Sequence, residues 1–274
     1  MVPIHFLLVF WFLAVMGSFH GHWWERAGLV LSMGIMCGVF GINLAHELGH
    51  RKNSIERFLA KSLLMTSLYM HFNIEHNKGH HKNVATPEDP SSARKGESLY
   101  FFWLRSVFGT WISAWKIEYS RLKKNGNSPF SLRNEMIRIL MAQSFWLFTI
   151  WYFFGMESLI FFVFAAIIGF LLLETVNYIE HYGLRRKQLP NGNYERALPI
   201  HSWNSDHILG RILLFELSRH SDHHYLASKK YQILSYHPES PQMPAGYPGM
   251  MLLALLPPLW FLIMDPLVEK NSPG

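Results

Sequence analysis

The chain has 274 residues, of which 50% are hydrophobic and 15% aromatic, and its formal net charge is +6. A basic balance can indicate nucleic-acid binding, but here the apolar residues fall in long blocks almost free of charge, so we expect no nucleic-acid partner. Basic residues beside apolar segments are typical of contact with membrane lipid. The single cysteine, Cys37, excludes an intramolecular disulfide and a cysteine-ligated metal cluster, so any metal must be held by His or carboxylate side chains.

Three apolar segments open the chain. Residues 2–17 predict a membrane helix, because they lack the basic flank and cleavage site of a signal peptide. Residues 27–45 carry no charge and are long enough to cross a membrane as a helix. Residues 58–72 are a shorter apolar stretch, which we expect to form a helical hairpin with the end of the preceding segment.

The second half of the chain contains further apolar stretches. Residues 99–118 mix aromatic and charged side chains, which predicts an interfacial amphipathic helix rather than a span. Residues 137–154 and 157–176 are joined by a short segment that begins at Gly155, and they predict a tight membrane hairpin. Residues 250–264 form the last apolar stretch, which two prolines interrupt.

The predicted fold class is all-α, an integral-membrane helical bundle that forms one domain over residues 1–274. Helices are expected because an open sheet leaves backbone groups without hydrogen bonds in lipid. The loops after residues 45, 118 and 183 are rich in Lys and Arg, so the positive-inside rule predicts that they face the cytoplasm. The histidine-rich segments lie on that same predicted side.

Nine of the sixteen histidines fall in four short segments: HELGH (46–50), EHNKGHH (75–81), NYIEHYG (177–183) and RHSDHH (219–224). Histidines three or four residues apart lie on one face of a helix, so each cluster can present its imidazoles to one point. The candidate metal ligands are His46, His50, His76, His80, His81, His181, His220, His223 and His224.

Nine ligand candidates predict two metal ions, because one ion rarely binds more than roughly six ligands. Imidazole suits iron, zinc, copper and nickel. Two ions with nitrogen-rich, thiolate-free ligation and open positions are typical of iron that binds O2. A di-metal site is therefore the hypothesis that the residues favour, while the identity of the metal stays open at this point.

Four carboxylates lie within or beside the histidine segments: Glu47, Glu75, Glu180 and Asp222. Direct metal ligation is possible for each of them. We favour a supporting role, in which the carboxylate accepts a hydrogen bond from the distal N–H of a ligating histidine and fixes its tautomer.

One histidine segment also matches a zinc-protease signature. Residues 46–50 read H-E-x-x-H, in which the Glu is the general base. A protease needs only one further ligand, so at least six of the seven other clustered histidines would then have no role. The di-metal hypothesis uses all of them and is preferred.

With these segments in view, the sequence resembles the membrane-bound alkane 1-monooxygenases, within the wider family of membrane fatty-acid desaturases and hydroxylases. The resemblance runs from about residue 27 to residue 266 and includes all four histidine segments. It also includes ATPEDP (85–90), HSWN (201–204), GYPG (246–249) and the dipeptide Asp265-Pro266. The NYIEHYG segment is characteristic of alkane and xylene-type hydroxylases and not of desaturases in general.

The resemblance implies a di-iron centre held by the nine histidines, with O2 as co-substrate. It implies hydroxylation of the terminal carbon of a medium-chain n-alkane to a 1-alkanol. Electrons would come from a rubredoxin, itself reduced by a flavoprotein rubredoxin reductase. The implied location is a bacterial inner membrane with the active site facing the cytoplasm, and no catalytic residue beyond the metal ligands is implied.

The sequence departs from the family pattern in three places. Arg51 stands where the family commonly has Lys, and Ser218 stands where Gln is usual. Family members usually carry roughly another membrane hairpin before the segment that matches residues 2–17, so we expect that this N-terminal hairpin is absent. In the family, the helices of this hairpin would form part of the wall of the substrate channel. Their absence would affect which alkane chain lengths the protein prefers. Side chains of residues 27–45 and 137–176 are the candidates for that wall, and no substrate-binding residue is assigned.

Several alternatives remain open on the sequence. A xylene-type hydroxylase attacks a methyl group on an arene, and a desaturase or fatty-acid hydroxylase applies the same metal chemistry to an acyl chain. A metal transporter would need polar residues along its spans, which residues 27–45 and 157–173 hardly offer. A basic surface either docks an acidic rubredoxin or contacts lipid headgroups; its residues are Lys123, Lys124, Arg185, Arg186 and Lys187.

Overall fold

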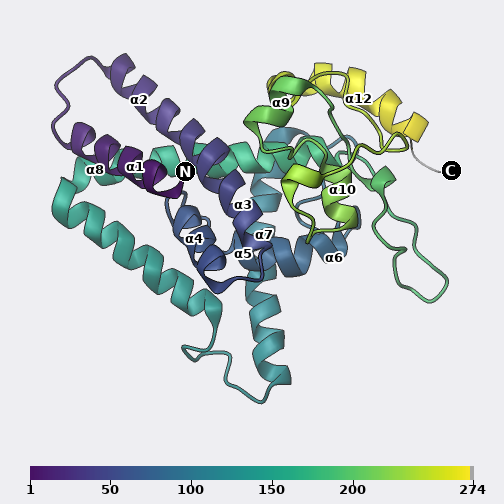
Figure 1. The fold of residues 1–274 in the computed structure, drawn as a ribbon, viewed down its shortest axis with the longest axis horizontal. Helices are drawn as coiled ribbons and strands as arrows, with labels where there is room; N and C mark the ends of the chain where they lie inside the picture. Colours follow the sequence, from purple (N-terminus) through teal and green to yellow (C-terminus); the bar gives the residue numbers. More distant parts are fainter. Residues whose placement is uncertain (272–274) are drawn as a thin grey trace. The chain divides into compact units, whose positions relative to one another are not determined.

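The computed structural model describes residues 1–271 as a helical protein (Figure 1). In that part of the chain the only extended pairings are two isolated bridges, between Gln188 and Tyr194 and between Asn204 and Gln242. The predicted all-α class is confirmed. The chain divides into two compact units, Met1–Ile74 with Ala114–Leu173 (unit 1) and Glu75–Ser113 with Glu174–Gly274 (unit 2).

Unit 1 begins with helix α1 (Val2–Gly17), which coincides with the first predicted segment. A longer helix follows, made of α2 (Trp23–Met36), a π-helical stretch η1 (Cys37–Ile42) and α3 (Asn43–Gly49). It begins where the Glu25 carboxylate accepts a hydrogen bond from the His22 backbone N–H at 2.8 Å, as in a capping box. The predicted span over residues 27–45 is therefore confirmed as a helix and extended at both ends.

Helix α4 (Ser54–Met65) packs against α3, which confirms the predicted helical hairpin. It begins at Asn53, whose side chain accepts the N–H of Ile55 at 2.8 Å. The helix is shorter than the apolar stretch over residues 58–72. It ends at a turn in which Leu68 takes a left-handed φ of 52°, so the apolar pattern alone overestimated its length.

Helix α8 (Glu135–His181) begins in unit 1 and contains a sharp bend at Gly155, where φ is 83° and ψ is 172°. Figure 1 shows two arms of α8 that diverge from this bend. Only glycine adopts this backbone conformation without large strain. The predicted division of residues 137–176 into two helices is therefore confirmed, and a single glycine makes the turn.

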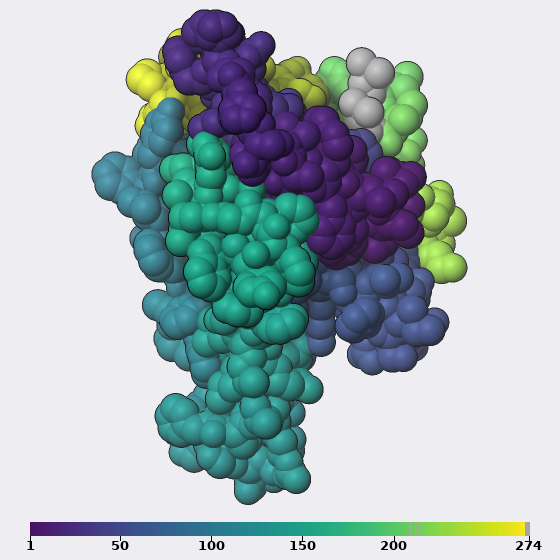
Figure 2. Space-filling view, turned by 90° about the vertical axis from the view of Figure 1, so that its left-hand side faces the viewer, coloured from purple at the N-terminus to yellow at the C-terminus, as the bar shows by residue number. Residues whose placement is uncertain are grey.

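Small residues let the helices of unit 1 approach closely. A Cβ placed on Gly34 would lie 3.1 Å from the backbone oxygen of Ala165, and one on Gly38 would lie 3.2 Å from that of Gly169. Close backbone approach through small residues is the usual means of helix packing in membranes. The buried side chains of this unit gather around Phe12, Trp146 and Phe162. The space-filling view shows α1, in purple, against α8, in teal (Figure 2).

Within residues 1–271, two helices are long and apolar enough to cross a membrane, Trp23–Gly49 and Glu135–His181. Helix α1 is a shorter apolar helix. Large apolar side chains stay exposed on these elements, including Trp11, Leu31 and Phe153. Such a surface is costly in water but ordinary in lipid, which fits the membrane character expected from the sequence.

Unit 2 consists mainly of short helices, and several of them carry the histidine segments. They are the π-helical η2 (His76–His80), α6 (His81–Asn83), the first part of α7 (Leu99–Lys124), the end of α8, η3 (Pro199–His201), α9 (Ile208–Leu213), α10 (His220–Tyr225), η4 (Tyr231–Ile233), α11 (Tyr247–Ala254) and α12 (Pro257–Asn271). The two prolines at 257–258 open a new helix, because proline suits the first helical turn. The predicted helix over residues 99–118 is found and continues to Lys124.

A core of large aromatic residues supports unit 2. Tyr178, Tyr182, Trp203, Tyr247 and Trp260 are all fully buried. Two of them donate to the backbone: the Trp203 Nε1–H bonds the Tyr182 carbonyl at 2.9 Å, and the Tyr178 hydroxyl bonds the Glu97 carbonyl at 2.7 Å. Buried aromatic side chains with bonded polar ends fix their neighbours in orientation as well as position. The histidine-bearing end of α8 is thereby held in place.

We predict that Gly155→Ala lowers the free energy of unfolding by about 1–3 kcal/mol, because alanine cannot adopt this backbone conformation without strain. The Cβ itself would meet no atom within 4 Å, so the effect is one of backbone strain alone. The measurement is equilibrium unfolding in detergent. The matched control is Gly28→Ala in α2, where the Cβ also meets nothing and φ is ordinary, and there we expect no loss. Equal effects of the two substitutions would contradict the prediction.

Candidate metal centre

The π-helical turn of η2 brings its histidines to one side. In an α-helix, residues five apart point in different directions, whereas the wider π-turn closes hydrogen bonds from i to i+5. His76 and His81, five residues apart, accordingly face each other with their Nε2 atoms 3.1 Å apart. The sequence predicted that this cluster would present its imidazoles to one point. The structure instead pairs His76 with His81, while His80 joins a different set of histidines.

Four buried histidines of unit 2 converge at one point: His80, His181, His220 and His224. Their ligand atoms all lie within 4.8 Å of one another. The Nε2 of His220 is 2.8 Å from that of His224 and 3.1 Å from that of His181. The Nε2 of His80 is 3.2 Å from that of His224. We call this set the His80 group; it joins η2, the end of α8 and α10.

Three more histidines of unit 2, His76, His81 and His223, also have ligand atoms within 4.8 Å of one another. The rings of His81 and His223 are 4.9 Å apart, and those of His76 and His223 stack at 6.1 Å. The spacing of three residues between His220 and His223 on α10 thus serves two groups. One short helix presents histidines to both.

The remaining two candidate ligands lie in unit 1. His46 lies on α3, and His50, four residues later, is the C-terminal cap of that helix. Their Nε2 atoms are 3.3 Å apart. The two rings meet edge to face, with centroids 4.9 Å apart. The spacing of four residues thus places both imidazoles on one face, as expected for a helix.

The convergence of these nitrogens fits a metal ion. A neutral imidazole carries one N–H, so a set of Nε2 atoms in mutual contact cannot all form hydrogen bonds with one another. Metal-bound nitrogens about 2.1 Å from an ion lie roughly 3 Å apart in neighbouring positions. The observed separations of 2.8–3.2 Å match that spacing. Imidazole ligands without thiolate suit iron, zinc, copper or nickel.

Buried carboxylates in unit 2 supply a second reason to expect cations. Glu75, Asp89, Glu174 and Glu180 are each at most 2% exposed. Burial is the main cause that raises the pKa of Glu75, and the negative charges of Asp89 and Glu174 raise it further. Buried carboxylates are unfavourable unless positive charge compensates them. Two divalent ions beside them would provide that charge.

The loop after α6 provides a residue that sequence reasoning did not assign. Asp89 accepts a hydrogen bond from Nδ1–H of His80 at 2.9 Å, which leaves the Nε2 of that ring to face the His80 group. Burial by itself would raise the pKa of Asp89, but His80 and the Ser92 hydroxyl, at 2.6 Å, hold it below its ordinary value. A carboxylate on the distal nitrogen fixes the tautomer and orientation of a ligand. The available signal was the ATPEDP stretch, which carries Asp89.

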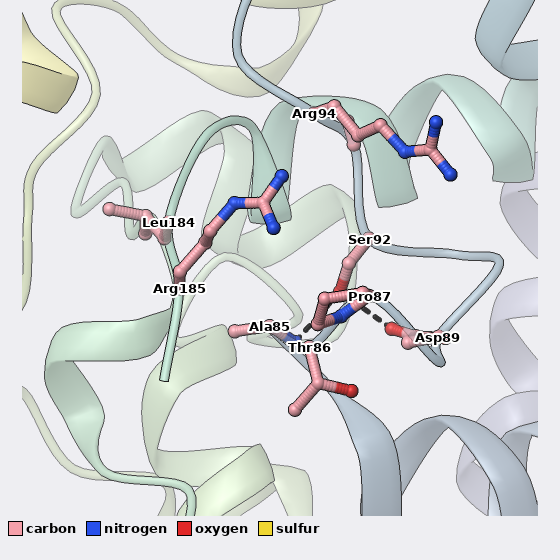
Figure 3. Close-up of a pocket in the computed structure, with 9 residues that line it drawn as sticks. Ala85, Thr86, Pro87, Asp89, Ser92, Arg94, Leu184 and Arg185 are labelled. Atoms are coloured by element: carbon pink, nitrogen blue, oxygen red, sulfur yellow. Dashed lines mark hydrogen bonds between the residues drawn. The ribbon is translucent and has the colours of Figure 1, made fainter. Parts of the chain in front are cut away.

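Arg105 on α7 fixes the loop that carries Asp89. Its guanidinium donates to the backbone oxygens of Pro90 and Ser92 at 2.9 and 3.0 Å and pairs with Glu97 at 2.7 Å. A small pocket opens beside the loop (Figure 3). In that view Asp89 and Ser92 line one side, and Leu184 and Arg185 line the other. Because the Arg105 guanidinium bonds several parts of this loop, it fixes the position of the Asp89 carboxylate.

The four carboxylates singled out in the sequence have different partners. Glu47 accepts from Arg51 at 3.0 Å, and its other oxygen is 3.9 Å from Nδ1 of His46. Glu75 accepts from the Ser113 hydroxyl at 3.1 Å. Glu180 lies 3.1 Å from Nε2 of His220 and accepts from the Tyr247 hydroxyl at 2.7 Å. This last pair brings Glu180 within hydrogen-bond distance of a clustered histidine.

Asp222 anchors the segment that follows α10. It accepts bonds from the Lys229 ammonium and the Ser235 backbone N–H, both at 2.6 Å, and from Nε2 of His237 at 2.9 Å. Burial alone would raise the pKa of Asp222, but these three donors hold it below its ordinary value. His237, an isolated histidine in the sequence, therefore has a partner outside the histidine groups.

Asn204 of the HSWN stretch positions α10. Its side-chain oxygen accepts the backbone N–H of Ser221 at 2.9 Å, and its amide donates to the Ser221 hydroxyl at 2.6 Å. The first N–H groups of a helix have no partner within the helix. Asn204 satisfies one of them from a distant part of the sequence. The helix that carries three histidines is thereby fixed in unit 2.

Comparison with known proteins identifies the family. Residues 21–254 match the fatty acid desaturase family. The chain belongs to the fatty acid desaturase family. It is 45% identical to alkane 1-monooxygenase 2 of Pseudomonas aeruginosa over 92% of this chain and 67% of the relative. It is 42% identical to the alkane 1-monooxygenase of Ectopseudomonas oleovorans over 100% of this chain and 68% of the relative. The resemblance expected from the sequence is confirmed.

A more distant relative has a different named substrate. The hydroxylase component of the xylene/toluene monooxygenase of Pseudomonas putida is 30% identical over 88% of this chain and 63% of the relative. Within this family, the sequence of the present chain therefore lies closer to proteins named for alkanes than to this one named for arenes.

We predict that Asp89→Ala weakens metal binding by about 10–100-fold, because His80 loses the carboxylate that fixes its tautomer. The measurement is competition for bound metal with a chelator of known affinity. Glu88→Ala is the matched control, since Glu88 is the exposed neighbour of Asp89 in the same loop. Unchanged affinity in Asp89→Ala, or equal loss in both variants, would contradict the prediction.

Proposed function

We propose that the chain is a di-iron alkane 1-monooxygenase that hydroxylates the terminal carbon of medium-chain n-alkanes. The observation that carries the proposal is the identity of 41–45% to several alkane 1-monooxygenases over 90–100% of the chain. The convergent histidine groups support it, because they fit a metal centre of the kind that O2 chemistry needs. One oxygen atom of O2 would enter the alcohol and the other would leave as water, at the expense of two electrons and two protons.

The proposal assigns iron ligation to all nine candidate histidines. Seven lie in unit 2, in the His80 group and the group of His76, His81 and His223. His46 and His50 are proposed as further ligands because their Nε2 atoms face each other in the same manner. Two bound iron ions would supply the activation of O2 that the side chains of the protein lack.

The residues of the chain supply position, charge and exclusion of water. Asp89 holds the imidazole of His80 in one orientation, and the buried carboxylates offset positive charge near the histidines. The apolar helices Trp23–Gly49 and Glu135–His181 suit a substrate that partitions into lipid. We therefore propose a membrane protein whose alkane enters from the bilayer, located in a bacterial inner membrane with its histidines on the cytoplasmic side.

The proposal is tested by product analysis with octane, O2 labelled with the heavy isotope, and a rubredoxin with its reductase. We expect 1-octanol that contains one labelled oxygen atom. We also expect the purified protein to contain about two irons per chain. His181→Ala removes a buried member of the His80 group, so iron content and product should both fall. Zinc in place of iron, with no loss in His181→Ala, would instead favour the protease that the HELGH segment suggests. Faster oxidation of p-xylene than of octane would favour a xylene-type hydroxylase. A desaturated or hydroxylated acyl chain as the product would favour a desaturase or fatty-acid hydroxylase.

The electron donor is proposed to be an acidic rubredoxin that binds exposed basic side chains of the chain. Lys123 and Lys124 are exposed at the end of α7 in unit 1, and Arg185 and Lys187 are exposed after α8 in unit 2. Arg186 instead donates to the backbone oxygens of Lys82 and Val84 at 2.9 and 3.1 Å, so it has a structural role. Complementary charge accelerates association, and salt screens it.

We predict that Arg185→Glu with Lys187→Glu slows reduction by rubredoxin by about tenfold or more at low salt, because opposite charges steer the two proteins together. The measurement is the reduction rate as a function of salt, with dithionite as a small reductant for control. Lys123→Glu with Lys124→Glu is the comparison pair on the other unit. Rates that depend neither on salt nor on either pair would assign these residues to lipid contact.

A further inference from the structure

The Glu180 carboxylate lies beside an atom proposed to face a metal. Its Oε2 is 3.1 Å from Nε2 of His220, and the side chain is 1% exposed. The same Nε2 is 2.8 Å from that of His224 and 3.1 Å from that of His181. The carboxylate oxygen therefore stands at the same distance from this nitrogen as the Nε2 of His181 does.

These distances would be unfavourable if Nε2 of His220 bound a metal ion that Glu180 did not share. A histidine nitrogen that binds a metal carries no hydrogen, so it cannot donate to the carboxylate. Lone pairs of nitrogen and oxygen would then face each other at 3.1 Å. An ion shared by the two atoms converts this repulsion into two metal–ligand contacts. Iron accepts carboxylate oxygen and imidazole nitrogen in the same site.

Tyr247 on α11 leaves one carboxylate oxygen available. Its hydroxyl donates to Oε1 of Glu180 at 2.7 Å, and its side chain is fully buried. The Glu180 backbone oxygen accepts the N–H of Trp203 at 2.8 Å, which fixes the main chain. The carboxylate thus has one oxygen bound by a neutral donor and the other directed at His220. This is the arrangement of a monodentate metal ligand that is oriented by its neighbour.

Asp89 shows what a merely supporting carboxylate does in the same unit. It bonds Nδ1 of His80, the ring nitrogen opposite to the one that faces the group. Glu180 instead meets Nε2, the nitrogen that takes part in the convergence. The two carboxylates therefore have different relations to the histidines that they contact.

We infer that Glu180 is a ligand of the metal ion held by His80, His181, His220 and His224, and that it binds through Oε2. The inference rests on the proposed di-iron function. A carboxylate ligand donates negative charge to one ion, which adds to the difference that their unequal histidine sets already make between the two irons. The ion with the carboxylate is stabilised in its oxidised state relative to an all-imidazole ion.

The test compares Glu180→Gln with Tyr247→Phe in the full chain purified in detergent. Iron content and the Mössbauer spectrum of the iron-57 protein are the measurements, so the readout does not depend on activity. We expect two inequivalent iron components in the wild-type protein. In Glu180→Gln one component should shift or be lost while the other stays, because the amide is a poorer ligand than the carboxylate. Tyr247→Phe keeps the carboxylate, so both components should remain.

Glu180→Asp is the second variant, which keeps the charge and withdraws it by one methylene, and it should shift the same component. Circular dichroism checks that the helices of each variant are intact. Full iron content with an unchanged spectrum in both Glu180→Gln and Glu180→Asp would overturn the inference alone. Wild-type protein that binds no iron would overturn the proposed function and this inference with it.

Discussion

The close approach of imidazole nitrogens is the constraint on which the rest of unit 2 depends. The Nε2 atoms of His80, His181, His220 and His224 converge on one point away from solvent. The pairs His220–His224, His181–His220 and His80–His224 are 2.8–3.2 Å apart. Neutral rings cannot satisfy one another in that arrangement, because each has a single N–H. A cation would resolve the conflict and would balance the charge of the buried carboxylates nearby. The surrounding structure can be understood as the means of holding these rings together.

Much of that structure consists of polar anchors reaching from distant parts of the sequence. Arg105 fixes the loop that carries Asp89, and Asn204 caps the helix that carries three histidines. The end of α8 is fixed by aromatic residues whose hydroxyl and indole groups bond backbone oxygens. Each anchor is buried or partly buried, where a lost partner costs more than it does at the surface. Rigid support of this kind is what a metal site needs from its protein.

Unit 1 is built on a different principle. Its helices are apolar, and Gly34 and Gly38 allow close backbone contact in place of polar anchors. A single glycine at 155 bends α8 and divides its long apolar sequence into two arms. Large apolar side chains remain on the outside of the helices. The chain thus combines an apolar part suited to lipid and to an apolar substrate with a polar part suited to metal chemistry.

Much of this could be predicted from the sequence, because the relevant signals are local. Apolar block length predicted the helices of α1 and α2–α3, and Gly155 predicted the division of α8. Histidine spacing of four residues predicted the pairs His46–His50 and His220–His224, and the segments themselves indicated the family. What a segment does locally follows from helical periodicity, which is a property of neighbouring residues.

Only the tertiary structure decided which groups meet across the sequence. The π-turn that joins His76 to His81 has no distinct sequence signal, and Leu68 ended α4 where the apolar pattern continued. Asp89 was not assigned because its bond to His80 depends on how the intervening loop closes. Asp222 and Glu180, two carboxylates with the same sequence context beside histidines, received different partners. The sequence determined the residue types and their helical faces, while long-range packing decided which carboxylate faces which nitrogen, because those distances depend on segments far apart in the chain.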